Sequence, residues 1–222
     1  MSESEMKLLP GKKHAPEFLG RVLVIGLGKS GMAAVTYLSA LVGTRVESVF
    51  VAAGAQNQKA QAFADRFASE NVTFAFDCEQ FSDSYDLCIA SPGISQFSDF
   101  YCNAAAASEE VVSEAEFAWR ESNKDARWVA ITGTNGKTTT TSLAAHILKR
   151  AGFNAAAVGN IGDVCLDAVA AGGVDVYVAE LSSFQLASTS LFTPVASVIL
   201  NITPDHLAWH KSHEAYVAAK LK

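Results

Sequence analysis

Apolar runs alternate with amphipathic stretches along most of the sequence. In the first half, short apolar runs predict strands at 21–26, 45–51, 71–76, 86–90 and 111–112. Stretches with apolar residues three or four positions apart predict helices at 30–41, 56–68, 100–107 and 114–120. Strands that alternate with helices are typical of βαβ units, so we expect a parallel, doubly wound sheet.

A polar stretch at 121–126 interrupts this pattern, and we place a domain boundary near residue 125. A second series follows, with strands predicted at 128–131, 154–158, 174–179 and 195–200. Helices are predicted from a glycine- and threonine-rich loop to residue 150, and from about residue 212 to the end of the sequence. In the first of these helices an apolar stripe is expected to face the core: Leu143, Ala144, Ile147, Leu148 and Ala151.

The fold class that these patterns predict is α/β. An N-terminal Rossmann-like domain with a parallel sheet is expected over 20–124, after a flexible lead-in at 1–19. Residues 125–222 are expected to form part of a P-loop ATPase-type α/β domain whose sheet looks unfinished.

Composition and charge narrow the function classes. Half of the 222 residues are hydrophobic and 18% are charged, which indicates a globular chain and not a disordered one. The formal net charge is −6 and Lys and Arg form no block, so we do not expect nucleic-acid binding. The most apolar long window, 22–42, holds Lys29 in its middle, which argues against a membrane span.

The cysteines and the start of the sequence point to the cytoplasm. Cys78, Cys88, Cys102 and Cys165 form no CxxC pair, so neither a zinc site nor a redox site is expected. Buried free thiols in a reducing compartment are the simplest interpretation. The first residues are acidic and polar, unlike a secretory signal. We therefore expect a cytoplasmic monomer with small-molecule partners and no membrane contact.

The strongest chemical signal is the glycine-rich loop after the strand at 128–131. The loop reads GTNGKTT over 133–139 and opens a helix. Backbone amides and a helix N-terminus suit a phosphate, Lys137 can reach terminal phosphates, and Thr138 can ligate Mg²⁺. The usual spacing places a glycine where Ile131 stands, so the motif is a shortened phosphate loop. The alternative is a threonine-rich turn that only caps the helix.

An earlier loop, with Gly26, Gly28 and Gly31, fits the spacing of a dinucleotide-binding loop between a strand and a helix. A nicotinamide enzyme would place a carboxylate at the end of the second strand, but 50–54 reads FVAAG. We expect a phosphate-bearing ligand that is not NAD. The alternative is a glycine turn that only lets the helix pack closely on the strand.

Two further residues follow predicted strands of the second domain. Glu180 ends one strand, and carboxyl ends of parallel strands meet at one sheet edge, so Glu180 is a candidate Mg²⁺ ligand. His206 follows the last strand at the same edge and could ligate a metal, although a single histidine in this position is more often structural. His210 and His213 are expected at the surface.

Seven segments together resemble the Mur ligases of peptidoglycan synthesis, in order and in spacing. The similarity runs from about Gly20 to the end of the sequence, and two of the strings point to the branch that adds D-glutamate. The matching segments are 26–31 (GLGKSG), 90–94 (ASPGI), 131–138 (ITGTNGKT), 159–162 (GNIG), 180–186 (ELSSFQL), 201–207 (NITPDHL) and 216–220 (YVAAK).

The resemblance implies that the first domain binds the UDP part of a substrate and the second binds ATP. Lys29 and Ser30 would lie at the uridine diphosphate, and Ser91 and Gly93 would line the uracil side. The residues that the resemblance assigns to ATP are Gly133, Thr134, Asn135, Gly136, Lys137, Thr138 and Thr139.

The resemblance also implies a site for two Mg²⁺ ions, around Thr138, Glu180 and His206. The family usually has an aspartate after the His-Leu pair, where this sequence has Ala208. A carboxylate that could orient His206 is therefore absent at that position.

The reaction that the resemblance implies is ATP-dependent formation of an amide bond. ATP would convert the carboxylate of UDP-N-acetylmuramoyl-L-alanine to an acyl phosphate, which the amine of D-glutamate attacks. Asn160, Ser182 and His206 would lie close to the substrate, and Lys220 matches a lysine that becomes a carbamate with CO₂. The catalytic residues implied are Lys137, Glu180, His206 and Lys220.

Members of this family continue into a third domain, so we expect these 222 residues alone to form little or no ligated product. A module that binds a UDP-sugar or nucleotide without catalysis is one alternative. A sister ligase that adds another amino acid is a second. A nicotinamide-dependent oxidoreductase is a third, and it would need the carboxylate that 50–54 lacks.

Overall fold

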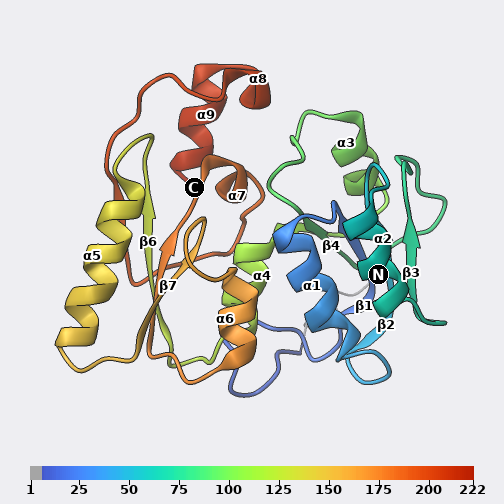
Figure 1. Ribbon diagram of the computed structural model, residues 1–222, viewed down its shortest axis with the longest axis horizontal. Coiled ribbons are helices and arrows are strands. Elements are labelled where there is room, and N and C mark those ends of the chain that lie inside the picture. The colour runs from blue at the N-terminus through green and yellow to red at the C-terminus, as the bar shows by residue number, and fades with distance from the viewer. Residues whose placement is uncertain (1–6) are drawn as a thin grey trace.

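The computed structural model describes residues 7–222, which form two α/β units side by side (Figure 1). The strands of the first unit are β1 (Gly20–Ile25), β2 (Val46–Ala52), β3 (Val72–Ala75), β4 (Leu87–Ala90) and β5 (Val111–Ser113). Its helices are α1 (Lys29–Ser39), α2 (Gln58–Phe67) and α3 (Asp99–Ala106). All five strands are parallel, in the order β3-β2-β1-β4-β5.

The second unit has a parallel sheet, and its four strands occur along the chain where the sequence predicts them. Its strands are β6 (Arg127–Thr132), β7 (Ala155–Gly159), β8 (Val176–Glu180) and β9 (Ala196–Ile199). Its helices are α5 (Lys137–Arg150), α6 (Cys165–Ala171), α7 (Ser183–Ala187), α8 (Leu207–His210) and α9 (His213–Lys220). The strand order is β7-β8-β6-β9. The α/β class with parallel sheets is therefore confirmed.

Helix α4 (Glu114–Glu121) lies between the two units (Figure 1). All eight of its residues are buried, including Glu114, Glu116, Arg120 and Glu121. Phe117 of this helix belongs to the same apolar cluster as Leu38 of the first unit and Trp128 of the second. One continuous core therefore joins the two sheets through α4.

Glu116, Arg120 and Glu121 are paired at this junction, whereas Glu114 forms no ion pair with any described residue. Arg45 donates two hydrogen bonds to Glu121 at 2.8 Å, and the Tyr37 hydroxyl donates a third at 2.8 Å. Arg120 bonds the carboxylates of Glu110 and Glu116 in the same way. Pairing of this kind removes most of the penalty that an isolated buried charge would carry.

The lead-in, predicted to be flexible, packs across this junction over the part that the structure describes. Lys13 N–H donates to the Ser122 carbonyl, His14 N–H donates to the Arg120 carbonyl, and Arg45 donates to the Pro16 carbonyl. We call residues 7–19 the strap. Residues 1–6 lie outside the described part of the chain.

The predicted core stripe of α5 is wrong in part. Leu143 and Ile147 are each 56% exposed, whereas Thr141 and Ala145 are buried. The helix packs on β7 and β8, and Ala144 and Leu148 of the predicted stripe lie against the same core cluster as Ala145. An α-helix with apolar residues on two neighbouring faces does not reveal from its sequence which face is covered.

Other differences are local. Short helices α6, α7 and α8 lie where the pattern predicts none, and α9 ends at Lys220, two residues before the end of the sequence. Cys88 and Cys165 are buried as expected, but Cys102 is exposed and Cys78 is half-buried. Between residues 7 and 222, no helix has both the length and the apolar character that crossing a membrane requires.

Candidate functional site

The second glycine loop joins the carboxyl end of β6 to the start of α5. Gly136 caps the helix with φ +83°, a left-handed conformation that suits glycine. Asn135, Gly136, Thr138 and Thr139 are exposed, so the loop opens to solvent at the sheet edge. The strand, loop and helix predicted for a phosphate site are therefore present in that order.

Side chains from distant segments hold this loop. The Asn201 side chain accepts from the Asn135 N–H at 2.9 Å and donates to the Asn135 carbonyl at 3.0 Å. The Thr134 hydroxyl lies 2.8 Å from the Tyr216 hydroxyl. The roles of Asn201 and Tyr216 escape sequence reasoning, although both residues begin segments that carry the family resemblance.

Two lysines meet at the loop. The Lys137 ammonium folds back and donates to the Thr134 carbonyl at 2.9 Å. Lys220, the last residue of α9, donates to the Thr132 hydroxyl at 3.2 Å and to the Gly133 carbonyl at 3.0 Å. Lys220 is only 4% exposed. Burial, followed by the charge of Lys137, lowers the pKa of Lys220 to about 8.

Glu180 lies beside this loop, because β6 and β8 are hydrogen-bonded neighbours and Glu180 pairs with Ile131. Its side chain is 1% exposed. The Asn160 side chain donates to one carboxylate oxygen at 2.7 Å, and the other oxygen is buried without a hydrogen-bond partner among the described residues. A buried carboxylate oxygen without a donor is suited to a cation or an ordered water.

The carboxylate of Glu180 does not belong to a larger cluster of acidic or imidazole ligands. Within residues 7–222, no three His, Cys, Asp or Glu side chains come together as a metal site. A Mg²⁺ ion at this edge would therefore take most of its ligands from hydroxyl groups, phosphates and water, as Mg²⁺ commonly does.

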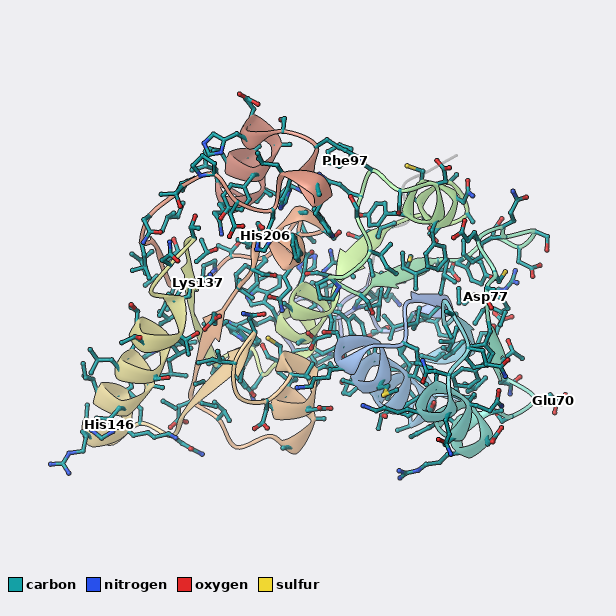
Figure 2. The ribbon with its side chains drawn as sticks, turned by 45° about the horizontal axis from the view of Figure 1, so that its top comes forward. Glu70, Asp77, Phe97, Lys137, His146 and His206 are labelled. Carbon is teal, nitrogen blue, oxygen red and sulfur yellow. The ribbon has the colours of Figure 1, made fainter. Side chains whose placement is uncertain are left out.

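His206 lies at the same edge, and Figure 2 shows it above the sheet on the side of Lys137, far from His146 at the other end of α5. Its backbone is left-handed, with φ +51°. The neighbouring Asp205 carboxylate accepts the His206 backbone N–H at 2.8 Å and approaches ring Nε2 at 3.5 Å. Asp205 thus supplies a carboxylate beside the ring. Ala208, which stands where the family usually has an aspartate, is exposed.

His210 is not at the surface, as the sequence interpretation expected, but is fully buried. Its Nε2 lies 2.9 Å from the Ser183 hydroxyl, and its ring is 5.6 Å from the ring of Phe184. Burial, with smaller effects from His206 and Lys220, lowers the pKa of His210. The bond to Ser183 ties α8 to α7, which no pattern within either segment reveals. His213 is half-buried.

The two residues predicted beside the substrate already have partners. The Asn160 amide bonds Glu180, as described above. Ser182 caps α7, and its hydroxyl accepts a hydrogen bond from the Gln185 N–H at 3.2 Å. In return, the Ser182 N–H donates to the Gln185 side-chain oxygen. This reciprocal arrangement is a capping box, and its S-x-x-Q signature is visible in the sequence.

The first glycine loop lies at the carboxyl end of β1. Strand β1 has β2 on one side and β4 on the other, so the strand order reverses next to β1. Ligands of open parallel sheets bind at such a reversal point. Ser91 follows β4, is buried, and donates from its hydroxyl to the Gly26 carbonyl at 2.9 Å. A Cβ atom on Gly31 would overlap the Gly26 carbonyl oxygen, so this glycine is needed for close packing.

The candidate UDP residues lie around this loop. Lys29 and Ser30 form the first turn of α1, and Gly93 follows Ser91 in the exposed loop after β4. Ser91 therefore contacts the first glycine loop directly, and Lys29 and Ser30 lie in the helix that follows this loop. The structure also confirms that β2 ends in alanines, followed by Gly54, without a carboxylate.

Comparisons with known proteins find a matching family model and similar sequences. A family model described as "Mur ligase middle domain" matches residues 131–222. A relative from Frankia casuarinae named UDP-N-acetylmuramoylalanine--D-glutamate ligase is 41% identical over 200 residues, covering 90% of this chain and 42% of the relative. A Corynebacterium diphtheriae protein of the same name is 36% identical over 228 residues, covering 100% and 46%. The chain thus spans less than half the length of these curated relatives.

A solved structure has the same fold. It is a UDP-N-acetylmuramate:L-alanyl-gamma-D-glutamyl-meso-diaminopimelate ligase from Neisseria meningitides, with a TM-score of 0.51 at 16% identity. The match covers 91% of this chain and 66% of that one. At this identity the likeness concerns the fold alone.

Proposed function

The chain belongs to the Mur ligase family, and we propose that it carries the nucleotide sites of an ATP-dependent ligase of peptidoglycan precursor synthesis. The specific reaction proposed is the joining of D-glutamate to UDP-N-acetylmuramoyl-L-alanine, since the curated relatives bear that name. The observation that carries the proposal is that Lys137 and Lys220 both bond the glycine loop, next to a strand whose last residue, Glu180, has a buried carboxylate oxygen without a partner among the described residues.

The chemistry explains why cations gather at this loop. A free carboxylate is a poor acyl donor because its oxygen cannot leave, and ATP supplies the phosphoryl group that makes the oxygen a leaving group. Two unit charges 4 Å apart repel by about 4 kcal/mol at an effective dielectric constant near 20. The ammonium of Lys137 and the loop amides lower this repulsion between the substrate carboxylate and the phosphates.

Thr138, Glu180 and His206 are the side chains that we propose for Mg²⁺. The bound ion would supply further positive charge beside the phosphates. The buried, partnerless oxygen of Glu180 supports this assignment, and Asp205 would keep the His206 ring oriented in place of a carboxylate at position 208.

Lys220 is proposed to act as an amine that combines with CO₂. A carbamate forms when the neutral nitrogen bonds to the carbon of CO₂ and releases a proton. A pKa of about 8 leaves roughly one Lys220 in ten neutral at pH 7, against fewer than about one in a thousand for an ordinary lysine. The buried position therefore supports this reaction.

We assign the UDP part of the substrate to the first loop, with Lys29 and Ser30 at the diphosphate and Ser91 and Gly93 towards the uracil. Asn160 and Ser182 would lie between the two loops, near the reacting carboxylate. We place the reaction in the cytoplasm, and we propose a monomer.

Binding measurements with single-site variants test the two assignments separately. Titration calorimetry of the 222-residue chain with Mg·ATP should show binding that Lys137→Ala weakens at least about tenfold, with UDP-N-acetylmuramoyl-L-alanine binding unchanged. Lys149→Ala, at the far end of the same helix, is the matched control and should bind Mg·ATP normally.

The proposal fails if Mg·ATP does not bind, or if Lys137→Ala and Lys149→Ala bind it equally well. Binding of NADH in place of the UDP compound would favour an oxidoreductase instead. Phosphate release that depends on D-glutamate, measured in a polypeptide as long as the relatives, distinguishes a ligase from a module that only binds nucleotides.

A further inference from the structure

A cavity of about 680 Å³ lies at the opposite end of the second sheet from the glycine loop. Arg127 begins β6 and Val176 begins β8, and both line this cavity, whereas the glycine loop follows the carboxyl end of β6. The other walls come from the strap, the segment that joins α4 to β6, and the end of α6. Its volume is within the range of about 300–1,000 Å³ that is typical of small-molecule sites.

The rim of the cavity carries charges of both signs. Lys12 of the strap and Arg127 are cationic, and Asp125 and Asp175 are anionic. None of these four side chains forms an ion pair with any residue of the range 7–222. Glu121, which also lines the cavity, is already paired with Arg45.

The floor of the cavity is aromatic and apolar. Tyr177 is 3% exposed and stacks on Trp128 at 4.6 Å, and its hydroxyl is not among the buried polar atoms that lack a partner in the described chain, so it is open to solvent in the cavity. Phe153 is half-exposed at the edge, with the Arg127 guanidinium 5.8 Å from its ring centre. Val174 and Val176 complete the apolar surface. A ligand in the cavity can replace water as the hydrogen-bond partner of this accessible hydroxyl.

We propose that this cavity binds a short zwitterionic peptide. A purely anionic ligand would meet Asp125 and Asp175, and a purely cationic one would meet Lys12 and Arg127. A molecule with an ammonium group at one end and a carboxylate at the other can pair with both sets. An apolar side chain between the two ends would rest on Phe153 and Tyr177 and offer the Tyr177 hydroxyl a backbone carbonyl.

The site lies where three parts of the chain meet. Lys12 belongs to the strap and Asp125 to the connection between the two units, whereas Arg127 and Tyr177 belong to the second sheet and Asp175 directly precedes it. A peptide that contacts all three holds the junction in the arrangement described here and so stabilises the folded chain. The site is independent of the nucleotide loops, so its test does not depend on the proposed ligase reaction.

Three forms of one dipeptide test the charge requirement. Alanyl-phenylalanine is titrated into the chain by two-dimensional NMR, next to its N-acetyl form, which lacks the ammonium, and its C-terminal amide, which lacks the carboxylate. The zwitterion should bind at least about tenfold more tightly than either capped form. Resonances near Tyr177 should shift, and those of the glycine loop should not.

Variants then locate the site. Asp125→Asn, Arg127→Gln and Tyr177→Phe should each weaken binding several-fold and leave UDP-compound binding unchanged. Lys124→Gln lies on the same connecting segment, does not line the cavity, and is the matched control. Thermal unfolding without peptide, measured for each variant, shows whether a loss of binding reflects a loss of fold.

Equal affinity for the three forms of the dipeptide would overturn the proposal. So would the absence of any shift near Tyr177, or binding that stays the same in folded Asp125→Asn and Arg127→Gln.

Discussion

Replacing Lys220 by methionine should stabilise the protein at neutral pH while removing a group that we propose for catalysis. Lys220 is 4% exposed, and burial together with Lys137 lowers its pKa from 10.5 to about 8. At neutral pH the folded chain must therefore hold a proton on an amine that disfavours it. The difference between the two pKa values corresponds to roughly 3 kcal/mol of unfolding free energy.

Part of this gain is offset by lost hydrogen bonds. The Lys220 ammonium donates to the Thr132 hydroxyl and the Gly133 carbonyl, and methionine cannot. Each such bond contributes about 1 kcal/mol. Methionine retains most of the aliphatic stem that packs inside α9. We therefore expect Lys220→Met to raise the free energy of unfolding by about 1–2 kcal/mol at pH 7.

The pH dependence gives a second, independent readout. Between about pH 8 and 10.5 the unfolded chain keeps the Lys220 proton and the folded chain has lost it, so wild-type stability rises with pH. The stability that this group contributes is present above pH 10.5 and is lost as pH falls through about 8. The variant has no such group and should lack this rise, which approaches ~1.4 kcal/mol per pH unit.

Urea unfolding followed by tryptophan fluorescence, at about pH 7 and about pH 9.5, measures both effects. Lys149→Met, at an exposed position of α5, is the matched control and should change neither the stability nor its pH dependence. The reasoning is refuted if Lys220→Met is less stable than wild type at neutral pH and the two proteins respond to pH alike.

Three further changes test the packing at the junction between the two units and at the first glycine loop. Burial raises the pKa of Glu114 to about 8, so wild-type stability should fall by up to ~5 kcal/mol as pH rises from about 4.5 to 8. Glu114→Gln should abolish that fall in pH-dependent urea unfolding, and an unchanged pH profile would contradict it. Gly31→Ala brings a methyl group against the Gly26 carbonyl and should cost about 1–3 kcal/mol in urea unfolding. Gly28→Ala, where the added Cβ meets nothing, should cost much less, and equal losses would speak against the packing argument. Arg45→Met leaves the buried carboxylate of Glu121 without its cation and should cost about 3–5 kcal/mol by thermal denaturation, and a loss below about 1 kcal/mol would contradict the pairing.

The elements that the sequence predicts correctly are those with local signals. The parallel strands and the longer helices lie within a few residues of their predicted bounds, because apolar periodicity is a property of the segment itself. The short helices α6, α7 and α8 have too few turns for a period to emerge. For α7 the capping signature of Ser182 and Gln185 was the available signal.

The glycine loops were predictable for the same reason, since their spacing and the flanking strand and helix are contiguous. Lys220 is different. From its own helix it is indistinguishable from a solvated lysine, and only the family resemblance singled it out. Its burial arises because α9 packs against the loop, where the Tyr216 hydroxyl bonds the Thr134 hydroxyl. A contact between residues so far apart in sequence has no local signature.

The two ends of the second sheet show where this limit lies. In a parallel sheet every strand ends at one edge, so strand-end residues such as Glu180 can be assigned to a common site from the order of strands and helices alone. The strands likewise begin at one common edge, which brings Arg127 and Val176 together, but the other walls of a site there depend on the connecting segments. Lys12 joins Asp125 and Asp175 only because the strap, expected to be flexible, packs across the junction. A site built by connections and not by strand ends can therefore be found only in the folded chain.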